Sequence, residues 1–280
     1  MNNPQTQVKS KIMIRLLALF LTILTANLSA SAQATESLRS LYVQNTYQIG
    51  IGSTNVLDTY LSQEMFRGTG LTLLTTSERQ KPGNRWSSLM QHQLSFTSAE
   101  DRAKTVNELQ GDYTFLYGRY YAWHYNRLHL QAGGAGNFNL GFIYNTSNSN
   151  NPAQARISLQ LMPSGIVTYD IPLFHRLMKL RYEVELPLAG VMFSPNYGQS
   201  YYEIFSRGNY DHNIVPTTFV SSPNLRQLLS VEYPIPHFAT MRIGYLGDYQ
   251  QAKVNNLKSH VYHHRVTIGF VHNFTISSRP

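Results

Sequence analysis

Residues 128–144 alternate between apolar and polar side chains with almost no exception. Leu128, Leu140 and Tyr144 belong to the apolar set, whereas His129 and Asn139 belong to the polar set. A period of two is the period of a β-strand, in which successive side chains point to opposite faces of a sheet. A long strand with one apolar face fits either a soluble β-sandwich or a transmembrane barrel whose apolar face contacts lipid.

Nine other segments alternate as well, though residues 66–77 do so poorly, and the chain then has ten clear strands. They span residues 41–52, 66–77, 85–98, 109–125, 157–169, 180–188, 225–233, 241–249 and 262–274. Two short stretches, residues 201–205 and 215–220, would raise the number to twelve, and both numbers are even, as in bacterial single-chain barrels. We therefore predict an all-β fold, a closed antiparallel transmembrane β-barrel of ten to twelve strands.

The polar faces carry charges that favour a barrel over a sandwich. Arg181, Glu183 and Glu185 share one face of the segment 180–188. Burying three charges in a dry core is costly, whereas a hydrated lumen holds them readily. They could line a selective pore, but side chains fill much of the lumen in barrels of this size, so we favour an internal ion-pair plug. The candidate partners in the lumen are Arg156, Asp170 and Arg242.

The first 32 residues have the features of a secretory signal peptide. Lys9, Lys11 and Arg15 precede an apolar run over residues 16–24, and an A-x-A site follows at residues 30–32. The apolar run is far shorter than the roughly 20 residues that a membrane-spanning helix needs. We expect cleavage after residue 32, with residue 34 as the second choice, and one barrel domain over residues 33–280.

Composition agrees with export and with a membrane barrel. The 19 tyrosines and 13 phenylalanines, with only 14% charged residues, suit aromatic girdles at the two membrane interfaces. Loss of three basic residues with the signal peptide lowers the net charge from +8 to +5, a weak basic excess that does not indicate nucleic acid as a partner. The chain has no cysteine, which excludes a lipidated cysteine anchor, disulfides and thiolate metal sites.

The connections between strands also favour a barrel. If both ends of the chain lie in the periplasm, the tight connections at residues 126–127 and 234–237 fall inside the cell envelope. The long polar connections at residues 146–154 and 194–224 then fall outside. Bacterial barrels have this asymmetry of short periplasmic turns and longer external loops.

Four stretches resemble a known family. They are TNVLDTYLS at residues 54–62, NNPA at residues 150–153, the run from Leu188 through FSPNYGQSYYEIF to Phe205, and IGF at residues 268–270. They are similar to a family of small Gram-negative outer-membrane β-barrel proteins known only as a domain of unknown function. The resemblance covers nearly the whole chain after the signal peptide, and it implies a barrel without implying an activity. Residues TISSRP follow Phe274, so the chain departs from the aromatic last residue that is common in outer-membrane barrels.

Enzyme chemistry finds little support in the sequence. An outer-membrane lipid hydrolase, the alternative function, would place a histidine and a serine two residues apart on one strand, and no His-x-Ser occurs. Asp211-His212 lacks a partner carboxylate pair, and we interpret it as part of a polar loop. His260 and His264 would lie about 13 Å apart on one strand face, with His263 on the other, so we expect interfacial histidines rather than a metal cluster. We predict no catalytic residue, cofactor or metal site.

Residues 194–224 depart from the strand pattern and form the best candidate for a functional segment. Loops longer than about 12–15 residues are uncommon unless they are functional or disordered, and this one is rich in aromatic residues. One interpretation is an external lid that stacks on a sugar or a lipid head group; the other is two further wall strands. The candidate contact residues are Tyr197, Tyr201, Tyr202, Glu203 and Phe205.

Together these features predict an outer-membrane protein of a Gram-negative bacterium that is not an enzyme. We expect a structural role or transport of small solutes. Its expected partners are outer-membrane lipid and the barrel-assembly machinery, with a small solute, a glycan or a lipid head group as a possible ligand.

Overall fold

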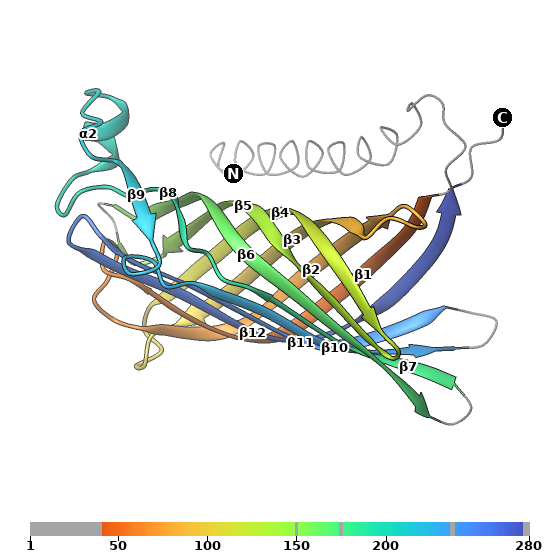
Figure 1. The fold of residues 1–280 in the computed structure, drawn as a ribbon. Helices are drawn as coiled ribbons and strands as arrows, with labels where there is room; N and C mark the ends of the chain where they lie inside the picture. Colours follow the sequence, from red (N-terminus) through yellow and green to blue (C-terminus); the bar gives the residue numbers. More distant parts are fainter. Residues whose placement is uncertain (1–40, 149–150, 174–175, 236–238, 277–280) are drawn as a thin grey trace. The chain divides into compact units, whose positions relative to one another are not determined.

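The fold comes from a computed structural model that describes residues 41–148, 151–173, 176–235 and 239–276. The predicted signal peptide, residues 1–32, lies outside the described residues. The described elements are twelve strand segments and one short helix (Figure 1). The strands are β1 (Leu41–Asp58), β2 (Phe66–Gln80), β3 (Trp86–Glu100), β4 (Asn107–Tyr125), β5 (Leu128–Asn145), β6 (Ala153–Leu173), β7 (Arg176–Glu185), β8 (Ala189–Phe193), β9 (Ile214–Thr218), β10 (Leu225–Pro234), β11 (Thr240–Val254) and β12 (Leu257–Ile276); the helix is α2 (Tyr201–Phe205).

Ten of the strand segments pair in a closed antiparallel ring. The order around the ring is β1, β2, β3, β4, β5, β6, β7, β10, β11 and β12, and β12 pairs again with β1 from Leu41↔Ile276 to Asp58↔Ser259. Each of these ten strands pairs with a strand on both sides, which satisfies most of the backbone groups of the wall. The prediction of a closed antiparallel barrel of ten to twelve strands is therefore confirmed, with ten strands in the ring.

The remaining segments, β8 and β9, are continuations of ring strands. β8 follows β7 after residues 186–188 and pairs with β6, while β9 precedes β10 by residues 219–224 and pairs with β8. The partner of Glu185 is Arg226, whereas the partner of Ala189 is Thr218, so seven residues of one strand lie opposite three of the other. Two neighbouring wall strands are thus interrupted at the same level. We call this level the break.

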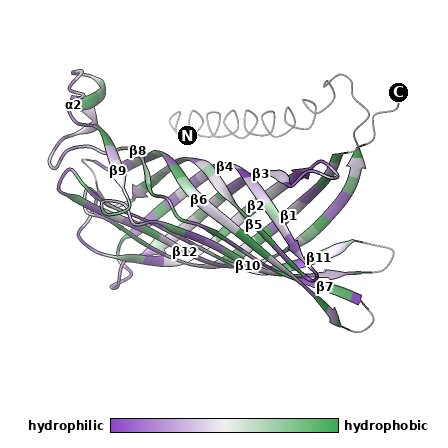
Figure 2. Cartoon of the chain, viewed as in Figure 1, coloured by the Kyte–Doolittle hydropathy of each residue, from purple (hydrophilic) through white to green (hydrophobic). Residues whose placement is uncertain are grey.

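The two faces of the wall differ in chemistry as the alternation predicts. On β5, Phe138, Leu140 and Phe142 are exposed on the outside, whereas Asn137 and Asn139 are buried on the inside. The same alternation of apolar and polar residues follows the other strands in Figure 2. An apolar outer face and a polar inner face are the pattern of a barrel that contacts lipid.

Asparagine closes two tight turns of the meander. Asn126 has a φ of 53° between β4 and β5, and Asn255 and Asn256 have φ values of 50° and 59° between β11 and β12. Asparagine tolerates this left-handed backbone better than most residues, and two such residues in succession are typical of a type I′ hairpin turn. The turn after β4 lies at the end of the barrel that holds the start of β1, and the turn after β11 lies at the opposite end.

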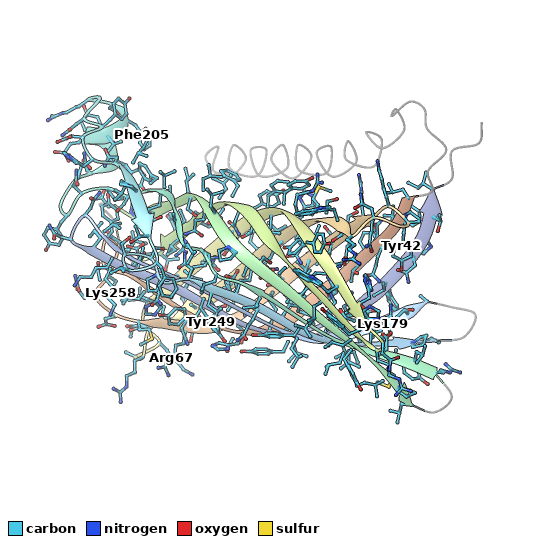
Figure 3. All side chains as sticks on the ribbon, viewed as in Figure 1. Tyr42, Arg67, Lys179, Phe205, Tyr249 and Lys258 are labelled. Carbon is cyan, nitrogen blue, oxygen red and sulfur yellow. The ribbon has the colours of Figure 1, made fainter. Side chains whose placement is uncertain are left out.

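The segment that links β8 to β9 lies at the same end as the turn after β11. Figure 1 shows α2 projecting beyond the strands there, and Figure 3 places Phe205 and Lys258 toward that end, with Tyr42 and Lys179 toward the other. The sequence allowed residues 201–205 to be a wall strand, but they form α2, so that alternative is wrong. Residues 214–218 do form a strand, β9. Within the described residues, no helix is long and apolar enough to cross a membrane.

Candidate functional site

The end of the lumen next to α2, which we call the outer end, is closed by an apolar cluster that we call the cap. It is formed by Val56, Leu61, Phe66, Ala99, Ile143 and Val261, with Tyr60 and Val106 packed against it. These residues come from five strands and from the loops beside them, and Leu61 reaches the cluster from the β1–β2 loop. An apolar cluster across the mouth excludes water, so it blocks the axial route into the barrel.

Loops from opposite sides of the ring meet above the cap. Asn148, in the β5–β6 loop, donates a hydrogen bond from Nδ2 to the carbonyl oxygen of Leu61 at 3.4 Å. In the ring order β1 and β6 are five strands apart, so this contact joins loops on opposite sides of the mouth. The cap is therefore fastened across the barrel and not only along neighbouring strands.

Deeper in the lumen, charged side chains form an ion-pair network. Arg181 contacts Glu78 at 3.0 Å and Glu183 at 2.7 Å, and Arg242 contacts Glu232 and lies 4.0 Å from Glu183. Glu183 is fully buried and Arg242 is 1% exposed. Isolated buried charges are costly, and this arrangement gives each of them at least one opposite partner.

A second set of polar contacts lies nearer the break. Arg226 pairs with Glu185 at 3.3 Å and donates to Gln93 Oε1, while Gln93 Nε2 donates to Asp248 at 2.9 Å. Gln91, on the same face of β3 as Gln93, donates to Glu183 at 3.0 Å. Because β3 lies across the lumen from β7 and β10, these bonds tie opposite walls together.

The predicted lumen charges occupy four different environments. Arg181, Glu183 and Arg242 share the ion-pair network, and Glu185 belongs to the second set. Asp170 lies instead at the other end of β6, where it contacts His129 at 3.2 Å. Arg156 lies near the outer end and donates from Nη2 to Gln250 at 2.8 Å. Asp170 and Arg156 are therefore not the partners of Arg181, Glu183 and Glu185 that the sequence suggested.

Apolar side chains fill much of the remaining lumen. One cluster contains Leu89, Leu116, Tyr120, Ala135, Met162 and Ile166, and a smaller one contains Leu74, Leu228 and Leu246. One cavity inside the described part of the barrel has a volume of about 70 Å³. At roughly 10–15 Å³ for each water, it holds about five waters, so it is a small chamber and not a channel through the barrel.

Three buried side chains stand in the order hydroxyl, imidazole, carboxylate. Thr54 Oγ1 lies 3.1 Å from His263 Nδ1, and His263 Nε2 lies 3.2 Å from Asp112 Oδ1. Arg265 Nη2 donates to Thr54 at 2.6 Å and lies 3.0 Å from His263 Nδ1. A guanidinium has no acceptor, so Nδ1 must accept and Nε2 must donate to Asp112.

This constellation lacks room for a substrate. Thr54 and His263 are fully buried, Asp112 is 3% exposed, and none of the three lines the chamber. A nucleophile needs space for the reacting atom beside it as well as a base. The arrangement is thus a buried polar cluster that joins β1, β4 and β12.

The predicted interfacial position of the histidines is wrong for His263, which lies inside the lumen. His264 points outward, and its Nδ1 lies 2.6 Å from the hydroxyl of Tyr245. His260, on the same outward parity, stacks on Tyr262 at 4.4 Å. The described residues contain no group of three or more histidines, aspartates or glutamates that could hold a metal ion.

Residues 194–213 link β8 to β9 and contain the short helix α2. We call them the external segment because α2 projects beyond the strands (Figure 1). Ser200 caps it by accepting a hydrogen bond from the backbone N–H of Glu203, and the Glu203 carboxylate accepts from the backbone N–H of Ser200. This is a capping box, which satisfies two backbone donors at the start of the helix. The backbone hydrogen bond from Ser200 holds the pKa of Glu203 below its usual range.

Tyr201 fixes the external segment to the rim of the barrel. Its hydroxyl donates to Gln154 Oε1 at 2.9 Å and accepts from the backbone N–H of Ala155 at 2.7 Å. Its ring lies edge-on to Tyr60 with centroids 5.8 Å apart and lies 6.1 Å from Phe193. Burial raises the pKa of the Tyr201 hydroxyl, which therefore stays protonated and able to donate.

The other predicted contact residues of the segment are exposed. Tyr197, Tyr202 and Phe205 are 71%, 63% and 62% exposed, and Arg207 lies over the Tyr202 ring at 5.4 Å. The segment is also held at the β11–β12 turn, where Asn255 Nδ2 donates to the carbonyls of Ser194 and His212. It is thus an ordered protrusion with Tyr201 as its anchor, while the remaining aromatics face outward.

Several lumen residues were not predicted from the sequence. They are Glu78, Gln91, Gln93, Asp112, Arg226, Glu232, Asp248, His263 and Arg265. Each occupies a position on the inward face of its strand, and this alternation could have identified them as lumen residues. Their interaction partners depend on which strands face one another across the ring, and the alternation does not determine that.

The closed antiparallel ring, with its apolar outer face and charged interior, defines a β-barrel of the membrane-spanning class. The chain belongs to the family described as "Protein of unknown function (DUF3316)", which matches residues 13–279. This confirms the resemblance to a barrel family of unknown function. No curated protein matches the chain.

Several solved structures are similar to the chain at low identity. The translocator domain of the autotransporter NalP from Neisseria meningitidis is 10% identical, with 95% of this chain and 97% of that chain covered and a TM-score of 0.38. Ail, the attachment invasion locus protein of Yersinia pestis, is 10% identical, with 82% and 98% covered and a TM-score of 0.33. A major outer membrane protein from Thermus thermophilus is 14% identical, with 83% and 99% covered and a TM-score of 0.35. At these identities and TM-scores, the similarities do not indicate a function for the chain.

Proposed function

We propose that the protein is a non-enzymatic outer-membrane barrel with a plugged lumen, which serves as a rigid support for the external segment. The observation that carries this proposal is the filled lumen, in which the apolar cap and the ion-pair network occupy successive levels. A conducting pore needs a continuous hydrated path, and a chamber of about 70 Å³ is not one. A structural role is thus favoured over transport of small solutes.

The outer face of the wall supports placement in the outer membrane. Exposed apolar side chains lie on successive outward positions of β6 and β12, such as Leu159 and Leu161, and Ile268 and Phe270. A contiguous apolar surface of this kind is unfavourable in water and favourable in hydrocarbon. The signal-like residues 1–32 add support from the sequence.

Location is tested by cell fractionation and by gel mobility before and after boiling. We expect the protein in the outer-membrane fraction and a folded band that shifts on heating. A periplasmic pool without a heat-modifiable band would contradict the proposal.

The plug is tested by conductance in planar bilayers. We expect the wild-type barrel to give no discrete conductance steps. As a positive control, replacing the cap residues Leu61 and Phe66 and the network residue Glu183 together by alanine should produce them. Discrete steps from the wild-type protein, with a correctly shifted gel band, would favour solute transport.

Lipid hydrolysis is the second candidate, because Thr54, His263 and Asp112 stand in the order that a hydrolase uses. We expect refolded protein in detergent to show no saturable hydrolysis of phospholipid. If hydrolysis is found and Thr54→Val abolishes it while preserving the heat-modifiable band, the polar cluster is an active site and the non-enzymatic proposal fails.

A further inference from the structure

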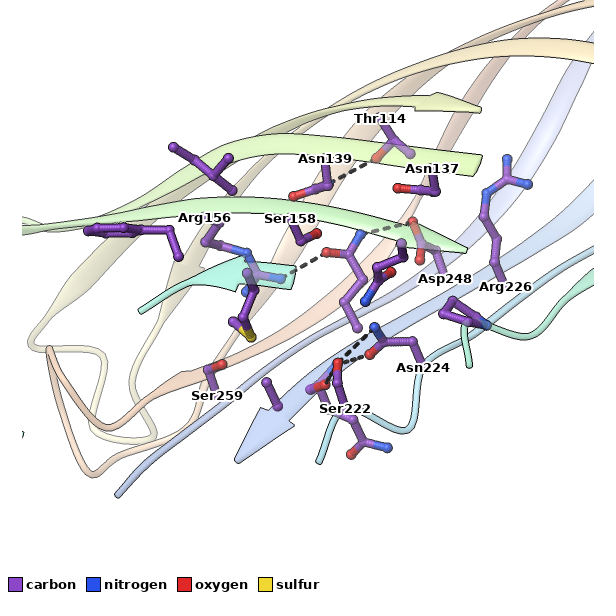
Figure 4. A pocket seen from close by; sticks show the side chains of 18 of the residues that line it. Thr114, Asn137, Asn139, Arg156, Ser158, Ser222, Asn224, Arg226, Asp248 and Ser259 are labelled. Atoms are coloured by element: carbon purple, nitrogen blue, oxygen red, sulfur yellow. Dashed lines mark hydrogen bonds between the residues drawn. The ribbon is translucent and has the colours of Figure 1, made fainter. Parts of the chain in front are cut away.

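The outer half of the lumen contains a polar chamber beside the break (Figure 4). β5 and β6 supply one wall, with Asn137, Asn139 and Arg156, and β11 supplies Asp248 and Gln250. Residues 222–226, at the interrupted start of β10, supply the opposite wall. The chamber ends at Arg226, which is already paired with Glu185 below it. It can therefore hold a ligand without opening a path through the barrel.

One donor in the chamber has no partner. Arg156 donates from Nη2 to Gln250, but its Nε is buried and makes no hydrogen bond with any described residue. Figure 4 shows the Arg156 side chain among the lining residues. A buried donor without a partner is unfavourable, and an acceptor brought by a ligand would relieve the cost.

The charges that line the chamber favour a neutral ligand. Asp58 and Asp248 carry two negative charges, and Arg156 and Arg226 carry two positive charges, so the formal charges cancel. Asp248 also accepts hydrogen bonds from Gln93 and Gln250. An anion or a cation would upset this balance, whereas a neutral molecule would not.

The neutral lining residues fit hydroxyl groups. Asparagine, glutamine and serine side chains offer both donors and acceptors, which is what a hydroxyl requires from its surroundings. The chamber lining includes Asn137, Asn139, Ser158, Gln160, Ser222 and Asn224. Met192 and Phe193 give one apolar edge that can contact the C–H groups of a sugar ring. The volume, about five waters, suits a single small ring and is far below that of a large-ligand pocket.

Access to the chamber is from the side of the break. The cap closes the axial mouth over β1, β2, β3, β5 and β12. Beside β11, side chains bind backbone groups that a neighbouring strand would otherwise pair. Ser222 Oγ donates to the Gln251 carbonyl, and Asn224 Oδ1 accepts from the Gln251 N–H. Tyr201 contacts Gln154 and Phe193, and both of these line the chamber.

We propose that this chamber binds one neutral, hydroxyl-rich group of the size of a monosaccharide, which enters between Tyr201 and the break. This binding goes beyond the supporting role proposed above and does not depend on it. If no ligand binds the chamber, the lumen remains filled and the proposed supporting role still holds. If a sugar binds, the barrel need not conduct ions.

The test uses the full refolded barrel in detergent with glucose, galactose and glycerol as probes and inorganic phosphate as the charged comparator. Saturation-transfer NMR and equilibrium dialysis should show saturable binding of at least one neutral probe and weaker binding of phosphate. Ser158→Phe fills the chamber and removes no hydrogen bond that the structure contains, so it should weaken binding at least tenfold. Ser88→Phe, on the outward face of β3, is the matched control and should bind as the wild type does.

Three outcomes would overturn the proposal. They are no saturable binding of any neutral probe by protein with a heat-modifiable band, tighter binding of phosphate than of the neutral probes, and equal binding by Ser158→Phe and Ser88→Phe.

The route is tested by exchange rates of the bound probe. Tyr201→Phe removes both hydrogen bonds of the anchor and should speed release severalfold, whereas Leu61→Ala in the cap should leave the rate unchanged. The reverse result would place the opening at the axial mouth.

Discussion

The wall of this barrel has a regular arc and a broken arc, and the lumen differs beside each. The regular arc contains β12, β1, β2, β3, β4 and β5, whose strands run uninterrupted for 15 to 20 residues. In the broken arc, β7 and β8 have 10 and 5 residues, and β9 and β10 have 5 and 10. The cap lies against the regular arc alone, whereas the chamber extends from β5 and β6 to the broken arc.

The difference shows what an interruption does to the inner surface. On β7, Glu183 and Glu185 face the lumen, whereas on β8 the inward residues are Gly190 and Met192, as their pairing with Gln160 and Ser158 shows. The parity changes because Leu188 and Ala189 both face outward, which is the effect of a β-bulge. A regular strand fills the lumen at every second residue, whereas a bulged strand leaves a gap. We infer that the break is what leaves space for the chamber.

The largest expected effect on the free energy of unfolding comes from removing the contacts between the two arcs. Glu183 lies on the broken arc and accepts from Gln91 on the regular arc, in addition to its contacts with Arg181 and Arg242. Glu183→Leu leaves two guanidiniums without this partner in a buried site and should cost about 3–5 kcal/mol in the free energy of unfolding. Denaturant titration in detergent measures it, with the exposed loop variant Glu64→Gln as control. A loss equal to that of the control would show that the network does not hold the arcs together.

Loosening the regular arc should have the next largest effect. Leu61→Ala removes a buried side chain from the cap and should lower the free energy of unfolding by about 2–3 kcal/mol. The matched variant Leu188→Ala lies on the exposed outer face and should change it far less in detergent. The temperature at which the folded gel band disappears compares the two. Equal shifts would mean that the cap does not contribute to stability.

Weakening the broken arc at a single side chain should have a smaller effect. Ser222→Ala removes the hydrogen bond from Oγ to the Gln251 carbonyl and the one that Oγ accepts from Asn224 Nδ2, and should cost about 1–2 kcal/mol. Ser230→Ala, in β10, removes a buried hydroxyl that has no partner among the described residues and should be neutral or slightly stabilising. The two variants make the same exchange of a hydroxyl for a hydrogen, so denaturant midpoints compare them directly. If Ser230→Ala is the more harmful, the side-chain ladder at the break is unimportant.

The smallest expected effect is a pH response of α2. Because its folded pKa is lowered from the ordinary value of 4.5, Glu203 stabilises the helix start above that value and loses this contribution as the pH falls through the lowered pKa. Protease cleavage in residues 194–213 should therefore rise on acidification below pH 4.5 and stay constant above it. Glu203→Gln keeps a capping box without a titrating group, so its cleavage should not depend on pH in that window. An unchanged pH profile in this variant would assign the response to another group.

The alternation of side chains was sufficient to predict the ring and its two faces. Phe138, Leu140 and Phe142 point outward as predicted, because a strand has only one period and one face of this wall is apolar. The same pattern failed at residues 201–205, where three aromatics in five residues fit neither period clearly. The sequence Ser200-Tyr-Tyr-Glu203 is a capping-box signature, and weighing it would have favoured a helix.

The contents of the lumen were less predictable than the wall. Parity places Asp112 and His263 inside, but they lie on β4 and β12 and meet only because the ring brings distant parts of the chain together. Likewise, Arg156 was expected to pair with carboxylates of β7, but it lies near the outer end, several residues above them. The level of a side chain along the barrel axis depends on strand register as well as on the face of its strand. That level depends on the register of every strand pair around the ring.

The cap also determines when the chain can finish folding. Val56 belongs to the first strand and Val261 to the last, so the cluster cannot assemble until β12 has been synthesised and has paired with β1. Contacts of such large sequence separation form late, since the loop between them must first be closed at an entropic cost. Before that step Leu61, Phe66 and Ile143 have no apolar surroundings inside the ring, and exposed apolar groups make an intermediate prone to aggregate. A chain that ends before β12 would therefore remain in this state.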